Sequence, residues 1–185
     1  NDEQWPYRVK FSGTDLLGNV TIPEGDPTDL ETSLEVSLDA SSESYPLHTF
    51  NLLNDGVMEK IAKAFKLQPS EIAGATLDAG TVKADGFSGP ADGKVAVGLT
   101  NPDGKVSYAY SANGIGFWIA ADGTASSWGD APIYYEYDAG GYGLTVGHNP
   151  GHSEKSKTYI IKPTMVYNKG GKLHKAVITI KMKFA

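Results

Sequence analysis

The chain has 185 residues, enough for one domain with its own hydrophobic core. Its formal net charge of −6 argues against nucleic-acid binding, which depends on lysine and arginine contacts to phosphates. Cysteine is absent, which excludes disulfides, thiolate metal sites and thiol nucleophiles within this sequence. No apolar run approaches the roughly 18 residues of a membrane-spanning helix, so we expect no transmembrane segment.

Residues 1–30 are expected to form an irregular extension or peripheral strands. Tyr7, Val9 and Phe11 alternate with basic residues, which is typical of a short strand, and glycines and prolines punctuate the acidic stretch that follows.

Charge is distributed unevenly between the two ends of the chain. Residues 1–60 contain twelve acidic and three basic residues, whereas residues 150–185 contain eight lysines and one acidic residue. We expect the two ends to pack side by side with acids facing lysines; the alternative is a basic face that binds a partner.

Residues 31–185 are expected to form one β-sandwich domain with a helix near residues 54–67. Val57, Ile61 and Phe65 recur at helical spacing, and Asn54 or Asp55 is placed to cap the helix. The apolar face of this helix is expected to pack in the core; the alternative is a helix that binds a partner.

Short alternating segments separated by Asp-Gly pairs predict β-hairpins. These pairs are Asp92-Gly93, Asp103-Gly104 and Asp122-Gly123, and Asn168-Lys169-Gly170-Gly171 has the same role before the last strand. In that strand Ile178, Ile180, Met182 and Phe184 face one way, and two outward lysines would discourage edge-to-edge pairing. The fold class is therefore mainly β, an antiparallel β-sandwich with one short helical segment.

Aromatic residues are concentrated between Tyr108 and Tyr142. Either some of these rings form a platform for sugar faces, with neighbouring carboxylates and amides that take the hydroxyls, or they are core and cross-strand pairs. Alternation puts Ile133, Tyr135 and Tyr137 on the core face and Tyr134 with Glu136 on the other; one of Phe117 and Trp118 should point outward. The tentative ligand-binding residues are Trp118, Trp128, Tyr134, Glu136, Asp130 and Asn113.

Other patterns carry little chemistry. His148 and His152 are four apart, but Pro150 and Gly151 between them indicate a turn, so we interpret both as solvent-facing loop residues and expect no metal site. Asp122, Asp130, Glu136 and Asp138 could supply the carboxylate pair of a glycosidase, as many acidic surfaces could. No nucleophile elbow, phosphate loop or dinucleotide motif is present, so we assign no catalytic residues and expect no cofactor.

The order of several motifs resembles a known family. The segments are Lys60–Leu67, Gly116-Phe117-Trp118-Ile119, Ser127-Trp128-Gly129 and Val146–Gly151. Over roughly residues 31–185 the chain resembles an uncharacterised domain of Bacteroidetes secreted lipoproteins, a DUF4859-type domain, sometimes attached to glycan-processing enzymes. The resemblance implies a β-sandwich at the cell envelope or cell surface, held to the membrane only by a lipid anchor upstream of Asn1. It supplies no established catalytic residues.

Three functions remain open from the sequence. The leading hypothesis is a non-catalytic binding module of the cell envelope, most suited to carbohydrate. The second is a structural or adhesive domain that contacts a host or surface protein, and the third is a glycan hydrolase. Exposed rings beside carboxylates would favour the first, a flat apolar patch or long unpaired edge strand the second, and a cleft with two converging carboxylates the third.

Overall fold

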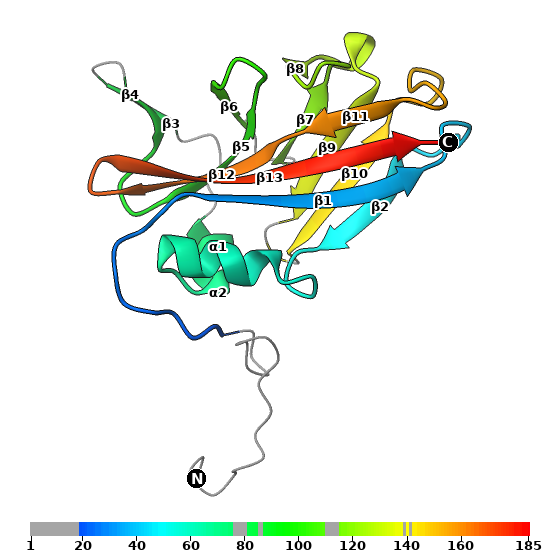
Figure 1. The fold of residues 1–185 in the computed structure, drawn as a ribbon. Coiled ribbons are helices and arrows are strands. Elements are labelled where there is room, and N and C mark those ends of the chain that lie inside the picture. The colour runs from blue at the N-terminus through cyan, green and yellow to red at the C-terminus, as the bar shows by residue number, and fades with distance from the viewer. Residues whose placement is uncertain (1–18, 76–80, 85–86, 110–114, 139, 141) are drawn as a thin grey trace, which may run out of the picture.

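Two β-sheets face each other across the hydrophobic core, and two helices lie along one side of the sandwich (Figure 1). This computed structural model describes residues 19–75, 81–84, 87–109, 115–138, 140 and 142–185. The prediction of a mainly β sandwich with a short helical segment is confirmed. The strand predicted around Tyr7, Val9 and Phe11 lies outside the described residues.

The larger sheet has six strands in the order β1-β13-β12-β5-β6, with β11 also paired to β13. All of its pairs are antiparallel except β1 with β13. The strands are β1 (Leu30–Leu38), β5 (Val95–Thr100), β6 (Val106–Tyr108), β11 (Thr158–Ile161), β12 (Pro163–Lys169) and β13 (Lys172–Phe184).

The parallel pair of β1 and β13 brings the acidic beginning of the chain beside its lysine-rich end. Leu30 pairs with Ala176, and the register continues to Leu38 opposite Phe184. The Lys183 ammonium contacts the Glu35 carboxylate, and this contact lowers the pKa of Glu35. The two ends therefore pack side by side as expected, and Glu35 with Lys183 is an acid that faces a lysine there.

Strand β13 is central in the sheet, not an edge strand. β1 pairs along one side of it, and β12 and β11 pair in turn along the other. The predicted alternation holds, because Ile178, Ile180, Met182 and Phe184 are buried. Its outward lysines consequently lie on a sheet face and do not guard a free edge.

The smaller sheet has five strands, all antiparallel, in the order β2-β10-β9-β7-β8. In Figure 1 strands β9 and β10 of this sheet pass behind the larger sheet and cross it steeply. They are β2 (Pro46–Asn51), β7 (Ile115–Ile119), β8 (Ala125–Ser126), β9 (Ile133–Asp138) and β10 (Gly143–His148). A hairpin of β3 (Thr81–Ala84) and β4 (Phe87–Pro90) forms a separate two-stranded sheet.

Helices α1 (Val57–Phe65) and α2 (Pro69–Ala75) lie beside β1 and close the core on that side (Figure 1). Val57, Ile61 and Phe65 are buried, as the helical spacing predicted. The prediction that Asn54 or Asp55 caps this helix was wrong, because the N-cap is Gly56, in a left-handed conformation and without a side-chain cap hydrogen bond. Asp55, one residue earlier, accepts a hydrogen bond from the Val57 N–H at 3.0 Å. None of the helices in the described part of the chain is long and apolar enough to cross a membrane.

Two of the Asp-Gly pairs form hairpin turns as predicted, at Asp103-Gly104 between β5 and β6 and at Asp122-Gly123 between β7 and β8. The prediction was wrong for Asp92-Gly93, which connects β4 to β5, two strands of different sheets. The Asp92 carboxylate instead accepts a hydrogen bond from the Gly170 N–H in the turn before β13. A distant partner, which a local pattern does not contain, therefore determines this connection.

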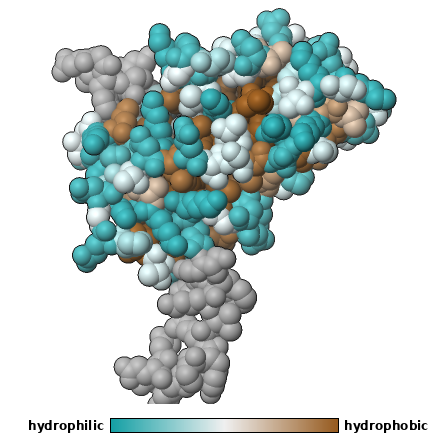
Figure 2. Space-filling model, in the orientation of Figure 1, coloured by the Kyte–Doolittle hydropathy of each residue, from teal (hydrophilic) through white to brown (hydrophobic). Residues whose placement is uncertain are grey.

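The face of the molecule that Figure 2 shows is mostly hydrophilic, with small apolar patches between polar side chains. This pattern agrees with the outward positions of β1 and β13, where Glu35, Lys181 and Lys183 are exposed. Ile160 on β11 is an exception, with 48% of its surface exposed.

Candidate functional site

Strand β9 presents its side chains alternately to the core and to the outside. Tyr135 is fully buried, and its hydroxyl donates a hydrogen bond to the Gly98 carbonyl of β5 in the opposite sheet. Tyr134 and Glu136 must therefore face away from the core. On the neighbouring strand, Phe117 packs against Tyr135 with the ring centroids 5.6 Å apart, so Trp118 shares the outer face with Tyr134.

Three rings from separate segments pack together on this outer face, and we call Tyr45, Trp118 and Tyr134 the aromatic cluster. Trp118 and Tyr134 are cross-strand neighbours, with ring centroids 5.0 Å apart. Tyr45, just before β2, meets Trp118 edge-on at 6.2 Å. Tyr45 is 42% exposed and Trp118 is half-buried, but only 7% of Tyr134 is exposed. The Tyr134 ring therefore packs beneath the cluster, and the solvent-accessible surface of the cluster comes from Tyr45 and Trp118.

Gly147 of β10 makes room for this packing. A Cβ atom at Gly147 would lie 2.6 Å from Cε1 of Tyr134 and closer still to the Tyr45 carbonyl. The Tyr134 ring therefore lies over bare backbone, and burial there raises the pKa of its hydroxyl to about 12. The nearby Glu136 carboxylate adds to this shift, since its negative charge opposes ionisation of the phenol.

Polar groups form the adjacent row on the same face, and we call Thr49, Thr145 and Glu136 the polar row. The three residues are aligned across β2, β10 and β9. The two threonine hydroxyls are 2.7 Å apart and share a hydrogen bond. Glu136 is exposed, so its carboxylate is free to accept hydrogen bonds from a ligand beside the aromatic cluster.

Trp128 and Asp130 lie in η2 (Trp128–Asp130), a short 3-10 turn between β8 and β9. The backbone of this turn is anchored, because the buried Asn149 side chain donates a hydrogen bond to the Trp128 carbonyl at 3.2 Å. The Trp128 side chain is nevertheless 56% exposed, and Asp130 is exposed too. A large ring held at the surface by a fixed backbone is suited to contact a ligand.

The structure brings only part of the predicted residue set together. Trp118, Tyr134 and Glu136 share the outer face of the smaller sheet. Trp128 and Asp130 lie in the turn after β8, the edge strand of that sheet. Asn113 lies outside the described residues. Tyr45 was not among the predicted site residues, because it lies far from the aromatic-rich segment in the sequence. The pairing of β2 with β10 brings it to the cluster.

His148 was interpreted as a solvent-facing loop residue, and that interpretation is wrong. It is the last residue of β10, on the inner face with Leu144 and Val146, and it is fully buried. Its Nδ1 lies 2.7 Å from the Ser153 hydroxyl, and its ring stacks on Phe184. His152 is exposed as expected. Over the described ranges, no group of three histidine or acidic side chains is placed to hold a metal ion.

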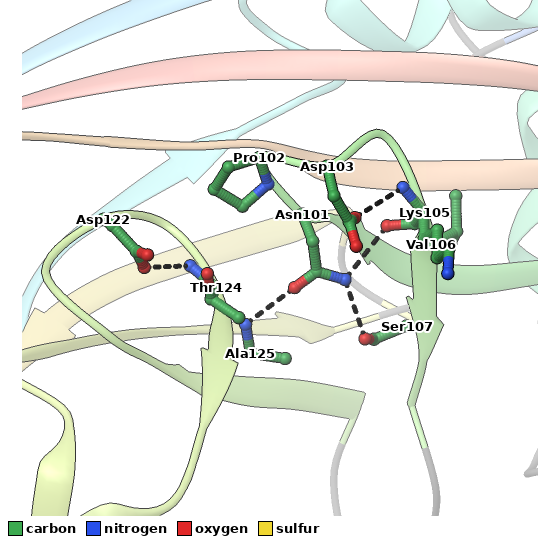
Figure 3. Close-up of a pocket in the computed structure, with 9 residues that line it drawn as sticks. All are labelled: Asn101, Pro102, Asp103, Lys105, Val106, Ser107, Asp122, Thr124 and Ala125. Atoms are coloured by element: carbon green, nitrogen blue, oxygen red, sulfur yellow. Dashed lines mark hydrogen bonds between the residues drawn. The ribbon is translucent and has the colours of Figure 1, made fainter.

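A separate pocket of about 620 Å³ lies between the β5–β6 and β7–β8 hairpins (Figure 3). The Asn101 side chain crosses it, accepting a hydrogen bond from the Ala125 N–H and donating to the Lys105 carbonyl and the Ser107 hydroxyl. Asn101 therefore ties an edge of one sheet to an edge of the other.

Two carboxylates at this pocket each accept a hydrogen bond from a backbone N–H of the turn to which they belong. Asp103 accepts from the Lys105 N–H, and Asp122 from the Thr124 N–H at 2.9 Å. These bonds from Thr124 lower the pKa of Asp122, which keeps it ionised at neutral pH and makes it a poor general acid.

A protein family matches most of the chain. The family is described as a domain of unknown function, DUF4859, and it matches residues 44–172. The match begins just before β2 and ends at the start of β13, so it includes the aromatic cluster and excludes β1. No curated protein and no solved structure matches the chain.

Proposed function

Because the chain belongs to the DUF4859 family, whose function is unknown, we propose a function from its own residues. The domain is a non-catalytic carbohydrate-binding module, and the sugar binds on the outer face of the smaller sheet. The proposal includes the extracytoplasmic, cell-envelope location and the lipid anchor that the sequence resemblance implies, which fractionation of cells that produce the full protein would test.

The observation that carries the proposal is the aromatic cluster beside the polar row. Accessible rings of Tyr45 and Trp118 offer apolar surface for the C–H faces of a sugar. Glu136 and the hydroxyls of Thr49 and Thr145 offer hydrogen-bond partners next to them. A mainly apolar surface with a few placed polar groups is the usual composition of a small-molecule site.

Two substitutions on a glycan array test this site. Trp118→Ala removes accessible cluster surface, and Trp128→Ala removes the exposed ring at the border. We expect each variant to lose at least about tenfold in affinity for the glycan that the native protein retains, as truncation of a central aromatic contact usually does. Ile160→Ala is the matched control, because it removes an exposed apolar side chain from the other sheet.

Folding is followed in parallel by thermal unfolding. Trp128→Ala should leave the melting temperature near that of the native protein, since the side chain is 56% exposed. The proposal fails if the native protein retains no glycan, or if both tryptophan variants remain folded and bind as tightly as the native protein. Release of reducing sugar by the native protein would instead support the hydrolase alternative.

A further inference from the structure

The two sheets differ sharply in the charges that they carry. The five strands of the smaller sheet contain no lysine or arginine, and their charged residues are Glu136 and Asp138, both exposed. The larger sheet carries five lysines, which are Lys169, Lys172, Lys175, Lys181 and Lys183. Four of these five lysines are on β13, so the cations are concentrated on the larger sheet and the strands of the smaller sheet carry only carboxylates.

One of the two carboxylates of the smaller sheet, that of Glu136, lies next to the aromatic cluster. Glu136 follows Tyr134 at the next outward position of β9, and Asp138 occupies the position after that. The Glu136 side chain leans toward β7, because a Cβ atom on Gly116 would lie 3.1 Å from its Cγ. That the Glu136 charge opposes ionisation of the Tyr134 phenol indicates that its field reaches the rings.

We infer that this face selects uncharged glycans and rejects those that carry carboxylate or sulfate groups, an inference that depends on the proposed function. Sugar hydroxyls donate well to carboxylates, in charge-assisted hydrogen bonds. An acidic sugar at the same position would meet the like charge of Glu136 and, on these five strands, no lysine or arginine to offset it. Selectivity here comes from repulsion of the acidic competitor as well as from attraction of the neutral ligand.

The test compares glycans that differ only in charge. Cellohexaose, mannohexaose and maltohexaose are each measured by titration calorimetry beside a counterpart whose C6 hydroxyls have been oxidised to carboxylates. For any backbone that binds, we expect the neutral form to bind at least about tenfold more tightly. The difference should shrink at high salt, since salt screens exposed charges.

Two charge-reversal variants localise the effect. Glu136→Lys should let the carboxylated forms bind, which would reduce the difference in affinity between each neutral glycan and its oxidised counterpart. Glu31→Lys, on β1 of the larger sheet, makes the same change in net charge and should leave this difference in affinity unchanged.

The possible results separate the inference from the proposed function. Equal or tighter binding of the carboxylated forms overturns the charge selectivity while the carbohydrate site stands. An equal effect of Glu31→Lys and Glu136→Lys also overturns it, because the selectivity would then come from net charge and not from this face. If no neutral or oxidised glycan binds, the proposed function fails and the inference fails with it.

Discussion

At the scale of single residues, Gly147 decides how the aromatic cluster is built. It is a central-strand position where any side chain would collide with Tyr134 and with the Tyr45 backbone. The absence of a Cβ allows a tyrosine to lie flat against β10 and so to become nearly buried on a face that is otherwise open to solvent.

Gly147→Ala is expected to destabilise the domain by about 1–3 kcal/mol, because the extra methyl group overpacks the site and the Tyr45 backbone cannot easily move. The measurement is urea unfolding followed by circular dichroism. Gly129→Ala is the control, since a Cβ there has no neighbour within 4 Å. Equal stability of the two variants would contradict this account of the cluster.

Burial of tyrosine hydroxyls predicts a loss of stability in alkali. Burial raises the pKa of Tyr134 from 10.0 to about 12, and it also raises the pKa of Tyr135 well above its ordinary value. The folded state then keeps protons that the unfolded state releases above pH 10, so the stabilisation is complete below that pH and is lost as the pH rises toward 12. We expect Tyr134→Phe to reduce the loss of unfolding free energy between about pH 9 and pH 12. An undiminished loss in that variant would show that Tyr134 is not among the responsible groups.

Residue-level alternation predicted the directions of side chains better than their exposure. It assigned Tyr135 to the core and Tyr134 with Glu136 to the other face, and these directions agree with the structure. It left open which of Phe117 and Trp118 faces outward, and the structure puts Trp118 there. It did not predict that Tyr134 would be nearly buried, because the ring lies against Trp118 of β7 and over the bare backbone of Gly147 on β10. Contacts of that kind depend on strand order, which a local pattern does not contain.

At the scale of elements, β1 completes a sheet from outside the family match. The match begins at residue 44, whereas β1 occupies Leu30–Leu38 and pairs with β13 over nine residues. Leu34 and Val36 pack against the core, and Leu38 is buried. The family boundary therefore does not coincide with the boundary of the folded unit.

A chain that begins at Ser44 is expected to be less stable than one that begins at Asn19 by at least about 3 kcal/mol, because it loses the apolar burial of Leu34, Val36 and Leu38. Thermal and urea unfolding of the two truncated chains measure the difference. The longer chain, which retains β1, is the control. Indistinguishable unfolding midpoints would mean that β1 is dispensable.

Local signals predicted most elements but not all of their connections. Helix α1 followed from apolar spacing, although its N-cap is Gly56 and not Asn54 or Asp55. The β5–β6 and β7–β8 hairpins followed from Asp-Gly turns. The parallel pairing of β1 with β13 joins residues about 150 positions apart, and only the charge imbalance between the chain ends pointed to it.

At the scale of the whole molecule, the sandwich separates two kinds of surface. One outer face carries lysines and glutamates that pair across β1 and β13, and the other carries rings, hydroxyls and carboxylates. The lysines of the C-terminal segment that belong to strands lie on the larger sheet, together with the glutamates of β1. The outer face of the smaller sheet, which carries the aromatic cluster, is therefore acidic, and this acidity is the basis of the charge selectivity inferred above.

The pairing of β1 with β13 also determines how the domain bears mechanical load. The chain enters the pair at Leu30 and leaves it at Ala185, and these points lie at opposite ends of a ladder whose strands run in the same direction. Tension applied through those two points acts along the strands, in shear. The backbone hydrogen bonds between β1 and β13 then bear the force together and do not break one after another.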